Sequence, residues 1–229
     1  MNEHEQVLSE EELDFLREMM NIGAGNAATA FRQMLQCKVE VVIPDVAVLS
    51  PQEAIYTLGD PSLPVTCAKM STLGDVLGDL FLIIEDEQKA RLTHLVEQAV
   101  GLPDRKAPLA DYKVKNLPSS LQSLKLEDLS VFSEISNILA GVYLTAIHDF
   151  CKLNIYHSVP TLGTDMIQAL LDESITVLSN GIQPIILVKN EFAVVETQVV
   201  TFLLMFPSKE SLQRLINSIK DARRKYGFE

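Results

Sequence analysis

The sequence predicts an α/β (α+β) protein in which two similar halves with antiparallel strands form one domain over residues 1–229. The order helix, strand, helix, strand, strand, helix occurs twice, and the strands follow one another without the strand–helix alternation of a parallel sheet. A chain of 229 residues with 47% apolar residues is also long enough for one sizeable core. We place repeat one at about 9–100, a linker at about 101–125 and repeat two at about 126–226.

The first repeat begins with a capping box, in which Ser9 and Glu12 satisfy free backbone N–H groups at the start of a helix. The helical spacing of apolar residues continues to about Gln36. The elements expected after it are a strand at 38–43 that Pro44 ends, a short helix at 51–58, strands at 64–70 and 76–85, and a helix at 86–100.

The linker is indicated by three prolines and little periodicity between residues 101 and 125. The elements expected in the second repeat are a helix at 127–150, a strand up to residue 159 that Pro160 ends, a helix at 164–178, strands at 184–192 and 195–206, and a helix from about 208 to 226. The last helix ends with three basic residues, which suit the negative carboxyl end of a helix dipole.

Composition excludes several classes of partner. With 19 basic and 31 acidic residues the formal net charge is −12, and such a surface repels nucleic-acid phosphates and anionic lipids. The amino terminus lacks the basic and apolar stretches of a signal peptide. The longest apolar runs, such as 199–206, fall far short of the roughly 20 residues of a membrane helix. We therefore expect a soluble, cytoplasmic protein that binds neither nucleic acid nor membrane.

The cysteines and histidines predict no metal site. Cys37, Cys67 and Cys151 lie far apart with no CxxC pair, which is typical of buried thiols in a reducing compartment. The four histidines form no HxxxH or HExxH set. We expect no cofactor and no metal of the protein's own.

An internal repeat carries the clearest functional signal. The segment Asn-Ile-Gly-Ala-Gly at 21–25 recurs as Asn-Ile-Leu-Ala-Gly at 137–141, an offset of 116 (137 − 21 = 116). The same offset relates Glu18 to Glu134, Asp14 to Ser130 and Pro44 to Pro160. We interpret the two halves as a duplicated unit.

Helical geometry places these residues on one face of each long helix. The positions i, i+4, i+7 and i+11 form one narrow stripe, whereas the large apolar residues fall near the opposite side. Asn and Gly are poor choices for helix stability alone, so the stripe favours contact with a partner. One alternative is that Asn21 and Asn137 only cap neighbouring backbone. The stripes consist of Asp14, Glu18, Asn21 and Gly25 on the first helix, and of Ser130, Glu134, Asn137 and Gly141 on the second.

The motif resembles the signature of the CheC, CheX and FliY family of CheY phosphatases. Asp14, Glu18, Asn21 and Pro44 match it, with 22 residues between Asn and Pro (44 − 21 − 1 = 22), and Ser130, Glu134, Asn137 and Pro160 match it with the same gap. Two copies in one chain look like the CheC type, because CheX carries one copy and works as a dimer. FliY adds a carboxyl-terminal flagellar switch domain, for which this sequence leaves no residues.

The resemblance implies a fold with two long active-site helices on one face, and a mechanism. The substrate would be the aspartyl phosphate of phosphorylated CheY, held with Mg²⁺ by the regulator itself. Asn21 and Asn137 would orient water, and Glu18 and Glu134 would accept from the regulator's lysine. Asp14 and Ser130 would support docking, with Gly25 and Gly141 leaving room for the regulator; Pro44 and Pro160 would be structural.

Two other functions remain open from the sequence. CheC-like proteins also bind the receptor deamidase CheD, so the chain is alternatively a non-enzymatic adaptor that binds and regulates CheD. Degraded motifs would favour the adaptor, and both motifs are intact here. A flagellar switch scaffold is disfavoured by the missing extra domain.

Overall fold

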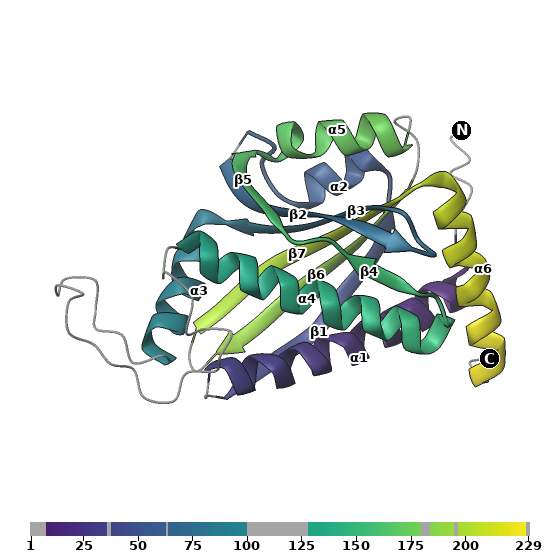
Figure 1. The fold of residues 1–229 in the computed structure, drawn as a ribbon, viewed down its shortest axis with the longest axis horizontal. Helices are drawn as coiled ribbons and strands as arrows, with labels where there is room; N and C mark the ends of the chain where they lie inside the picture. Colours follow the sequence, from purple (N-terminus) through teal and green to yellow (C-terminus); the bar gives the residue numbers. More distant parts are fainter. Residues whose placement is uncertain are drawn as a thin grey trace.

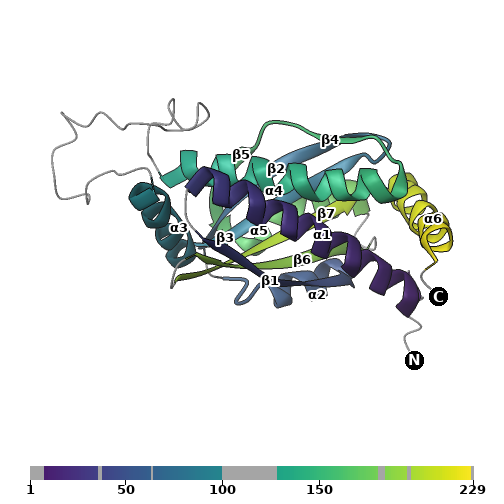
Figure 2. The same cartoon turned by 90° about the horizontal axis from the view of Figure 1, so that it is seen from below.

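The computed structural model describes residues 8–35, 38–62, 64–99, 128–179, 184–194 and 197–227. These residues form a single seven-stranded sheet with helices on both faces (Figure 1). The long helices α1 (Glu10–Leu35) and α4 (Asp128–Cys151) lie side by side over one face (Figures 1 and 2). The predicted α+β class is therefore confirmed.

The sheet is antiparallel at every pairing among the described strands. Its order is β1-β6-β7-β3-β2-β4, and β5 also pairs with β2. The strands are β1 (Val39–Leu49), β2 (Pro64–Gly74), β3 (Gly78–Glu85), β4 (Ile155–His157), β5 (Thr161–Met166), β6 (Ile185–Val194) and β7 (Thr197–Pro207).

The strands of the two halves are interleaved in this sheet. β1 pairs with β6 of the second half, and β4 and β5 pair with β2 of the first half. The central pair β3 and β7 joins the halves, with Leu82 opposite Leu203. Reading the order from either edge gives the same sequence of corresponding strands, so the sheet is pseudo-symmetric about its centre. The boundaries proposed for the repeats stay a prediction, and the linker at 101–125 lies outside the described residues.

The capping box predicted for α1 is present. Glu12 donates its backbone N–H to Ser9 Oγ at 3.3 Å. Ser9 donates its backbone N–H to Glu12 Oε2 at 2.8 Å. Ser208 caps α6 in a similar way through the backbone N–H of Ser211. The other helices are α2 (Pro51–Thr57), α3 (Asp86–Ala99), α5 (Ile167–Ser179) and α6 (Lys209–Tyr226).

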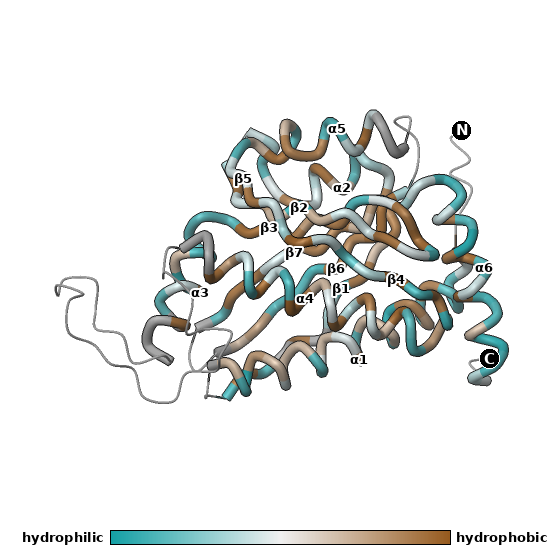
Figure 3. The backbone as a smooth tube through the Cα atoms, viewed as in Figure 1, coloured by the Kyte–Doolittle hydropathy of each residue, from teal (hydrophilic) through white to brown (hydrophobic). Residues whose placement is uncertain are grey.

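Two hydrophobic cores lie on opposite faces of the sheet. The larger core joins α1, α3, α4 and α6 to the sheet, and it includes Leu16, Phe132 and Leu139. The smaller core lies under α2 and α5, with Leu171 and Phe206 among its members. Inward residues alternate along the strands, and Figure 3 shows the apolar strands at the centre of the molecule. The two long helices are therefore held from one side only.

The two motif prolines interrupt strands rather than end them, which corrects the prediction. β1 continues through Pro44 to Leu49, with a register shift between Val42 and Asp45. In the second half, β4 ends three residues before Pro160 and β5 begins directly after it, so α5 starts at Ile167 rather than residue 164. Proline has no N–H for the ladder and is tolerated at bulges and edge strands. β1, β4 and β5 are strands of the two sheet edges.

The helix α4 is apolar enough to pass for a membrane span by length and composition over Val131–Cys151, but 56% of that window is buried inside the fold. The sequence analysis expected no segment that could pass for a membrane helix. The packing of α4 against the sheet identifies it as a core helix. Cys67 and Cys151 are free and buried, as predicted. Burial raises the pKa of each of these thiols to about 12. Cys37 lies outside the described residues.

Candidate functional site

The helices α1 and α4 run antiparallel and contact each other along their length (Figures 1 and 2). Phe15 near the start of α1 packs edge-on against Phe150 near the end of α4, with ring centroids 6.0 Å apart. Farther along, a Cβ atom on Gly23 would lie only 2.8 Å from Cδ1 of Tyr143. The absence of a side chain at Gly23 therefore allows the helices to pack at this point.

The polar stripe points away from this packing, as the sequence predicted for the described side chains. The large apolar residues predicted on the opposite side, among them Leu16 and Tyr143, are fully buried. Most stripe residues of α1 are exposed, namely Asp14, Glu18 and Gly25, and Asn21 is half-buried. On α4, Asn137 is exposed, whereas Glu134 and Gly141 are half-buried. The side chain of Ser130 is not among those described.

The reactive side chains of the stripe have no partner within the described part of the protein. No hydrogen bond or ion pair there engages the side chain of Glu18, Asn21, Glu134 or Asn137. Asp14 differs, because its carboxylate binds the guanidinium of Arg17 at 2.7 Å. The interpretation that the two asparagines cap neighbouring backbone is therefore wrong for the described residues. Their amides are available to another molecule.

The two stripes make two separate sites. Gly23 meets Tyr143, so Asn21 lies two residues before this contact on α1 and Asn137 lies six residues before it on α4. Because the helices are antiparallel, the two amides lie on opposite sides of the contact. At 1.5 Å per residue, about 12 Å separates them along the helix axes. One phosphoryl group cannot bind both.

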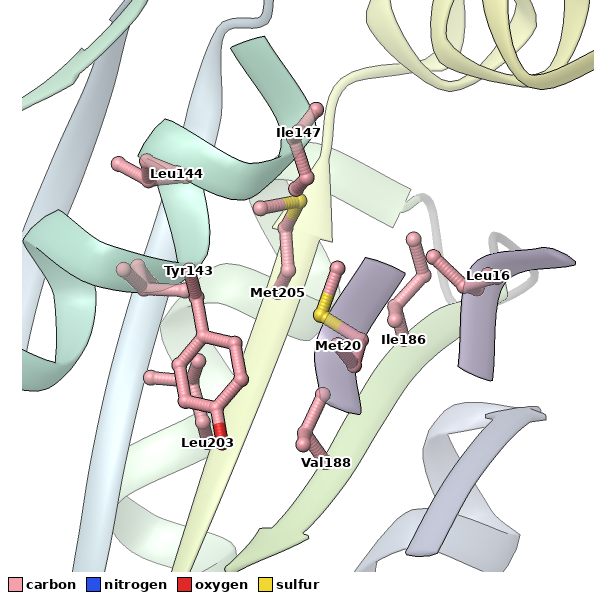
Figure 4. Close-up of a pocket in the computed structure, with 10 residues that line it drawn as sticks. Leu16, Met20, Tyr143, Leu144, Ile147, Ile186, Val188, Leu203 and Met205 are labelled. Atoms are coloured by element: carbon pink, nitrogen blue, oxygen red, sulfur yellow. The ribbon is translucent and has the colours of Figure 1, made fainter. Parts of the chain in front are cut away.

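Three pockets in the described part of the protein contain no stripe residue in their lining. The cavity beneath the two helices has a volume of about 20 Å³, close to that of one water, and is lined by apolar side chains (Figure 4). Leu16 and Met20 contribute to it from α1, and Tyr143 and Ile147 from α4. An open hollow of about 350 Å³ next to α5 lies in the other helical layer. The described stripe side chains lie on exposed or half-buried helix faces, from which they can reach a pocket on another protein.

The stripe side chains that the structure describes offer amides and carboxylates. No group of three or more His, Cys, Asp or Glu residues that could hold a metal ion occurs in the described ranges. An amide both donates and accepts hydrogen bonds, and a carboxylate accepts from a cation. Such groups can position water and charge.

Sequence reasoning placed Tyr143 on the apolar face without its polar contact, and it did not single out His157. Tyr143 donates its hydroxyl to Oδ1 of buried Asn190 on β6. His157 on β4 approaches the stripe, with Nε2 3.8 Å from the place of a Cβ atom on Gly141. The signal was available: 116 positions earlier the sequence has Ala27 and Val41, so both are places where the repeat changes from apolar to polar.

Comparison with known proteins gives consistent matches. The model of the CheC-like family matches residues 11–46 and 127–163, which contain both stripes and both prolines. CheY-P phosphatase CheC of Bacillus subtilis (strain 168) is 34% identical over 172 residues, which cover 75% of each chain.

Solved structures of FliY and FliM have the same fold. The crystal structure of FliY from Thermotoga maritima superposes with a TM-score of 0.69 at 16% identity, covering 95% of this chain and 100% of that one. The middle domain of FliM from H. pylori gives a TM-score of 0.58 at 11% identity, with coverage of 92% and 99%. These likenesses establish the fold, and the sequence match to CheC carries the family assignment. The chain belongs to the CheC-like family.

Proposed function

We propose that this protein is a cytoplasmic phosphatase that hydrolyses the aspartyl phosphate of phosphorylated CheY. The single observation that carries the proposal is the duplicated stripe, whose Asn and Glu side chains are unpaired in the described structure. The name of the 34% identical Bacillus subtilis relative supports it. The buried, free thiols of Cys67 and Cys151 suit the reducing cytoplasm.

In the proposed mechanism the phosphoryl group stays in the regulator's pocket with its Mg²⁺, because the stripe residues line none of the three pockets described above. The amide of Asn21 or Asn137 enters that pocket and orients a water molecule for in-line attack on phosphorus. The bond from phosphorus to the aspartate oxygen breaks, inorganic phosphate leaves and the carboxylate is restored. Glu18 or Glu134 accepts from the regulator's lysine and so sets the docked geometry.

The remaining stripe residues serve docking in this proposal. Gly25 has no atom within 4 Å of the place of a Cβ atom, so the regulator can approach the helix backbone closely there. Gly141 also lacks a side chain, but His157 Nε2 lies 3.8 Å from the place of a Cβ atom there. Asp14, held by Arg17, and Ser130 would contact the regulator beside its pocket rather than at the phosphate.

The direct test is phosphate release from phosphorylated CheY. We expect the wild-type protein to accelerate it, N21A or N137A alone to retain about half of the activity, and the double variant to lose it by about 100-fold or more. All should stay folded, because stability changes by about 0.5 kcal/mol or less at exposed Asn137 and by about 1 kcal/mol or less at half-buried Asn21. Asn26→Ala is the matched control, since Asn26 is an exposed amide on α1 outside the stripe.

Two outcomes would contradict the proposal. A folded double variant as active as wild type would place the chemistry elsewhere. Wild-type protein that releases no phosphate, yet binds CheD, would favour the adaptor function.

A further inference from the structure

His157 makes the second site differ from the first. It lies on β4 opposite Thr72 of β2 and points to the same side of the strand as Ile155, which belongs to the core that includes α4. Its Nε2 atom is 3.8 Å from the place of a Cβ atom on Gly141. At Gly25, the corresponding stripe residue of α1, nothing lies within 4 Å. Among the described residues, a ring therefore lies beside the glycine of the second stripe and none lies beside that of the first.

The hydrogen bonds around His157 determine which ring nitrogen is free. Nδ1 lies 3.0 Å from the carbonyl oxygen of Ser158. Because a carbonyl oxygen only accepts, Nδ1 carries the proton, and in the neutral ring Nε2 remains an acceptor. No donor to Nε2 occurs among the described residues, and the side chain is half-buried. The atom that faces the stripe is thus the unused acceptor.

The backbone beside His157 is held firmly. Ser158 donates its N–H to the carbonyl of Ser71 at 2.9 Å, and its Oγ accepts from the N–H of Ser71 at 3.0 Å. Both bonds tie the segment to β2, an inner strand of the sheet. The ring is therefore presented by a rigid element, as a recognition residue requires.

We propose that His157 is a docking residue of the second site only, whose Nε2 accepts a hydrogen bond from the regulator bound at Glu134 and Asn137. This rests on the proposed function of the stripe. The donor is a lysine or a backbone N–H at the rim of the regulator's pocket, which approaches α4 over Gly141. In the first repeat the corresponding residue is Val41, which offers no such group. The two sites then bind the regulator with different affinities.

The test uses backgrounds that isolate each site. Asn21→Ala leaves only the second site and Asn137→Ala leaves only the first. In each background His157 is changed to Asn, which keeps a donor near Nδ1 but lacks an acceptor at Nε2, and to Gln, which restores one. Steady-state phosphate release from phosphorylated CheY gives KM and kcat, and thermal unfolding reports the fold.

We expect His157→Asn to raise KM about fivefold in the Asn21→Ala background, the effect of losing one hydrogen bond, with kcat changed less than about twofold. His157→Gln should recover most of the loss. Neither should change KM in the Asn137→Ala background. If His157→Asn unfolds, His157→Val, which copies Val41, replaces it.

An unchanged KM in the Asn21→Ala background, or equal changes in both backgrounds, would overturn the role of His157. A KM that Gln does not restore would also overturn it, since a structural role would explain that result. Failure of the proposed function gives a different result: the Asn21→Ala, Asn137→Ala double variant would remain active whatever residue stands at 157.

Discussion

The helices α1 and α4 present nearly the same outer stripe but different inner surfaces. On the outside, Glu and Asn recur at the same spacing, and their side chains have no partner among the described residues. On the inside, Gly23 of α1 corresponds to Leu139 of α4, and Ala27 corresponds to Tyr143 (139 − 116 = 23; 143 − 116 = 27). Small residues on one helix thus face large residues on the other, as the contact of Gly23 with Tyr143 shows. The halves share a surface chemistry and have diverged where they pack together.

Tyr143 adds a buried polar link that α1 lacks. Its hydroxyl donates to Oδ1 of Asn190, and Nδ2 of Asn190 donates to the carbonyl of Val188 at 3.3 Å. Burial raises the pKa of the Tyr143 phenol, so it stays protonated and remains a donor. The link connects α4 to β6 under the helical layer, and it fixes the tyrosine ring against Gly23. The inner surfaces are therefore complementary and cannot be exchanged.

The largest expected effect comes from separating the two halves. Residues 1–100 expressed alone would lose β6, the partner of β1, and residues 126–229 would lose β2, the partner of β4 and β5. We expect neither fragment to give a cooperative unfolding transition or dispersed amide resonances. Mixing them should restore both, because every strand then regains its neighbour.

A fragment that folds on its own would contradict the mutual dependence of the two halves. It would mean that each repeat forms an independent sheet, contrary to the interleaved order β1-β6-β7-β3-β2-β4.

Much of the fold could be predicted because it is local. Helical periodicity, capping at Ser9 and the two runs of paired strands place most elements within a few residues of their observed ends. The interleaving of the halves depends on pairings between residues far apart in sequence, such as Val39 with Val194, and no local pattern encodes them. The strand ends at Pro44 and Pro160 were wrong for a related reason: a proline ends a central strand but is tolerated in an edge strand, and edge position is a property of the whole sheet.

A smaller but clear effect is expected from giving α1 the inner residue of α4. Gly23→Leu should lower the free energy of unfolding by about 2 kcal/mol, since even a Cβ atom would lie 2.8 Å from the ring of Tyr143. The better helix propensity of leucine offsets part of the clash, by about 1 kcal/mol. Urea unfolding measures the change.

Gly25→Leu is the matched control, because nothing lies within 4 Å of a Cβ atom there. We expect it to be neutral or slightly stabilising, while phosphatase activity through the first site falls. Equal destabilisation at the two positions would show that the helices do not pack at Gly23 in the way described.

The candidate site was predictable to the extent that it is a repeat. Glu18, Asn21, Glu134 and Asn137 stand out because the same spacing occurs twice, and helical geometry is enough to place them on one face. The repeat marks His157 only as a position that differs from Val41, and the folded structure is needed to place its ring beside Gly141. Whether the predicted residues act in catalysis depends on the partner, which a single chain does not contain.

The smallest expected effect concerns the carboxylates that both stripes share. If Glu18 and Glu134 each meet a cation on the regulator, the double Glu→Gln variant should slow phosphate release a few-fold at low salt and subsaturating phosphorylated CheY. The wild-type rate should fall toward that of the variant as salt rises, because the Debye length shortens to about 8 Å at physiological ionic strength.

The matched control is the double variant Glu85→Gln, Glu210→Gln. Both carboxylates are exposed and lie outside the stripes, and the net charge changes equally, from −12 to −10 (−12 + 2 = −10). The control should behave as wild type at every salt concentration. A wild-type rate that is flat across salt, together with a fully active stripe variant, would show that the carboxylates common to the two helices are ordinary solvated groups. The functional likeness of α1 and α4 would then reduce to their asparagines alone.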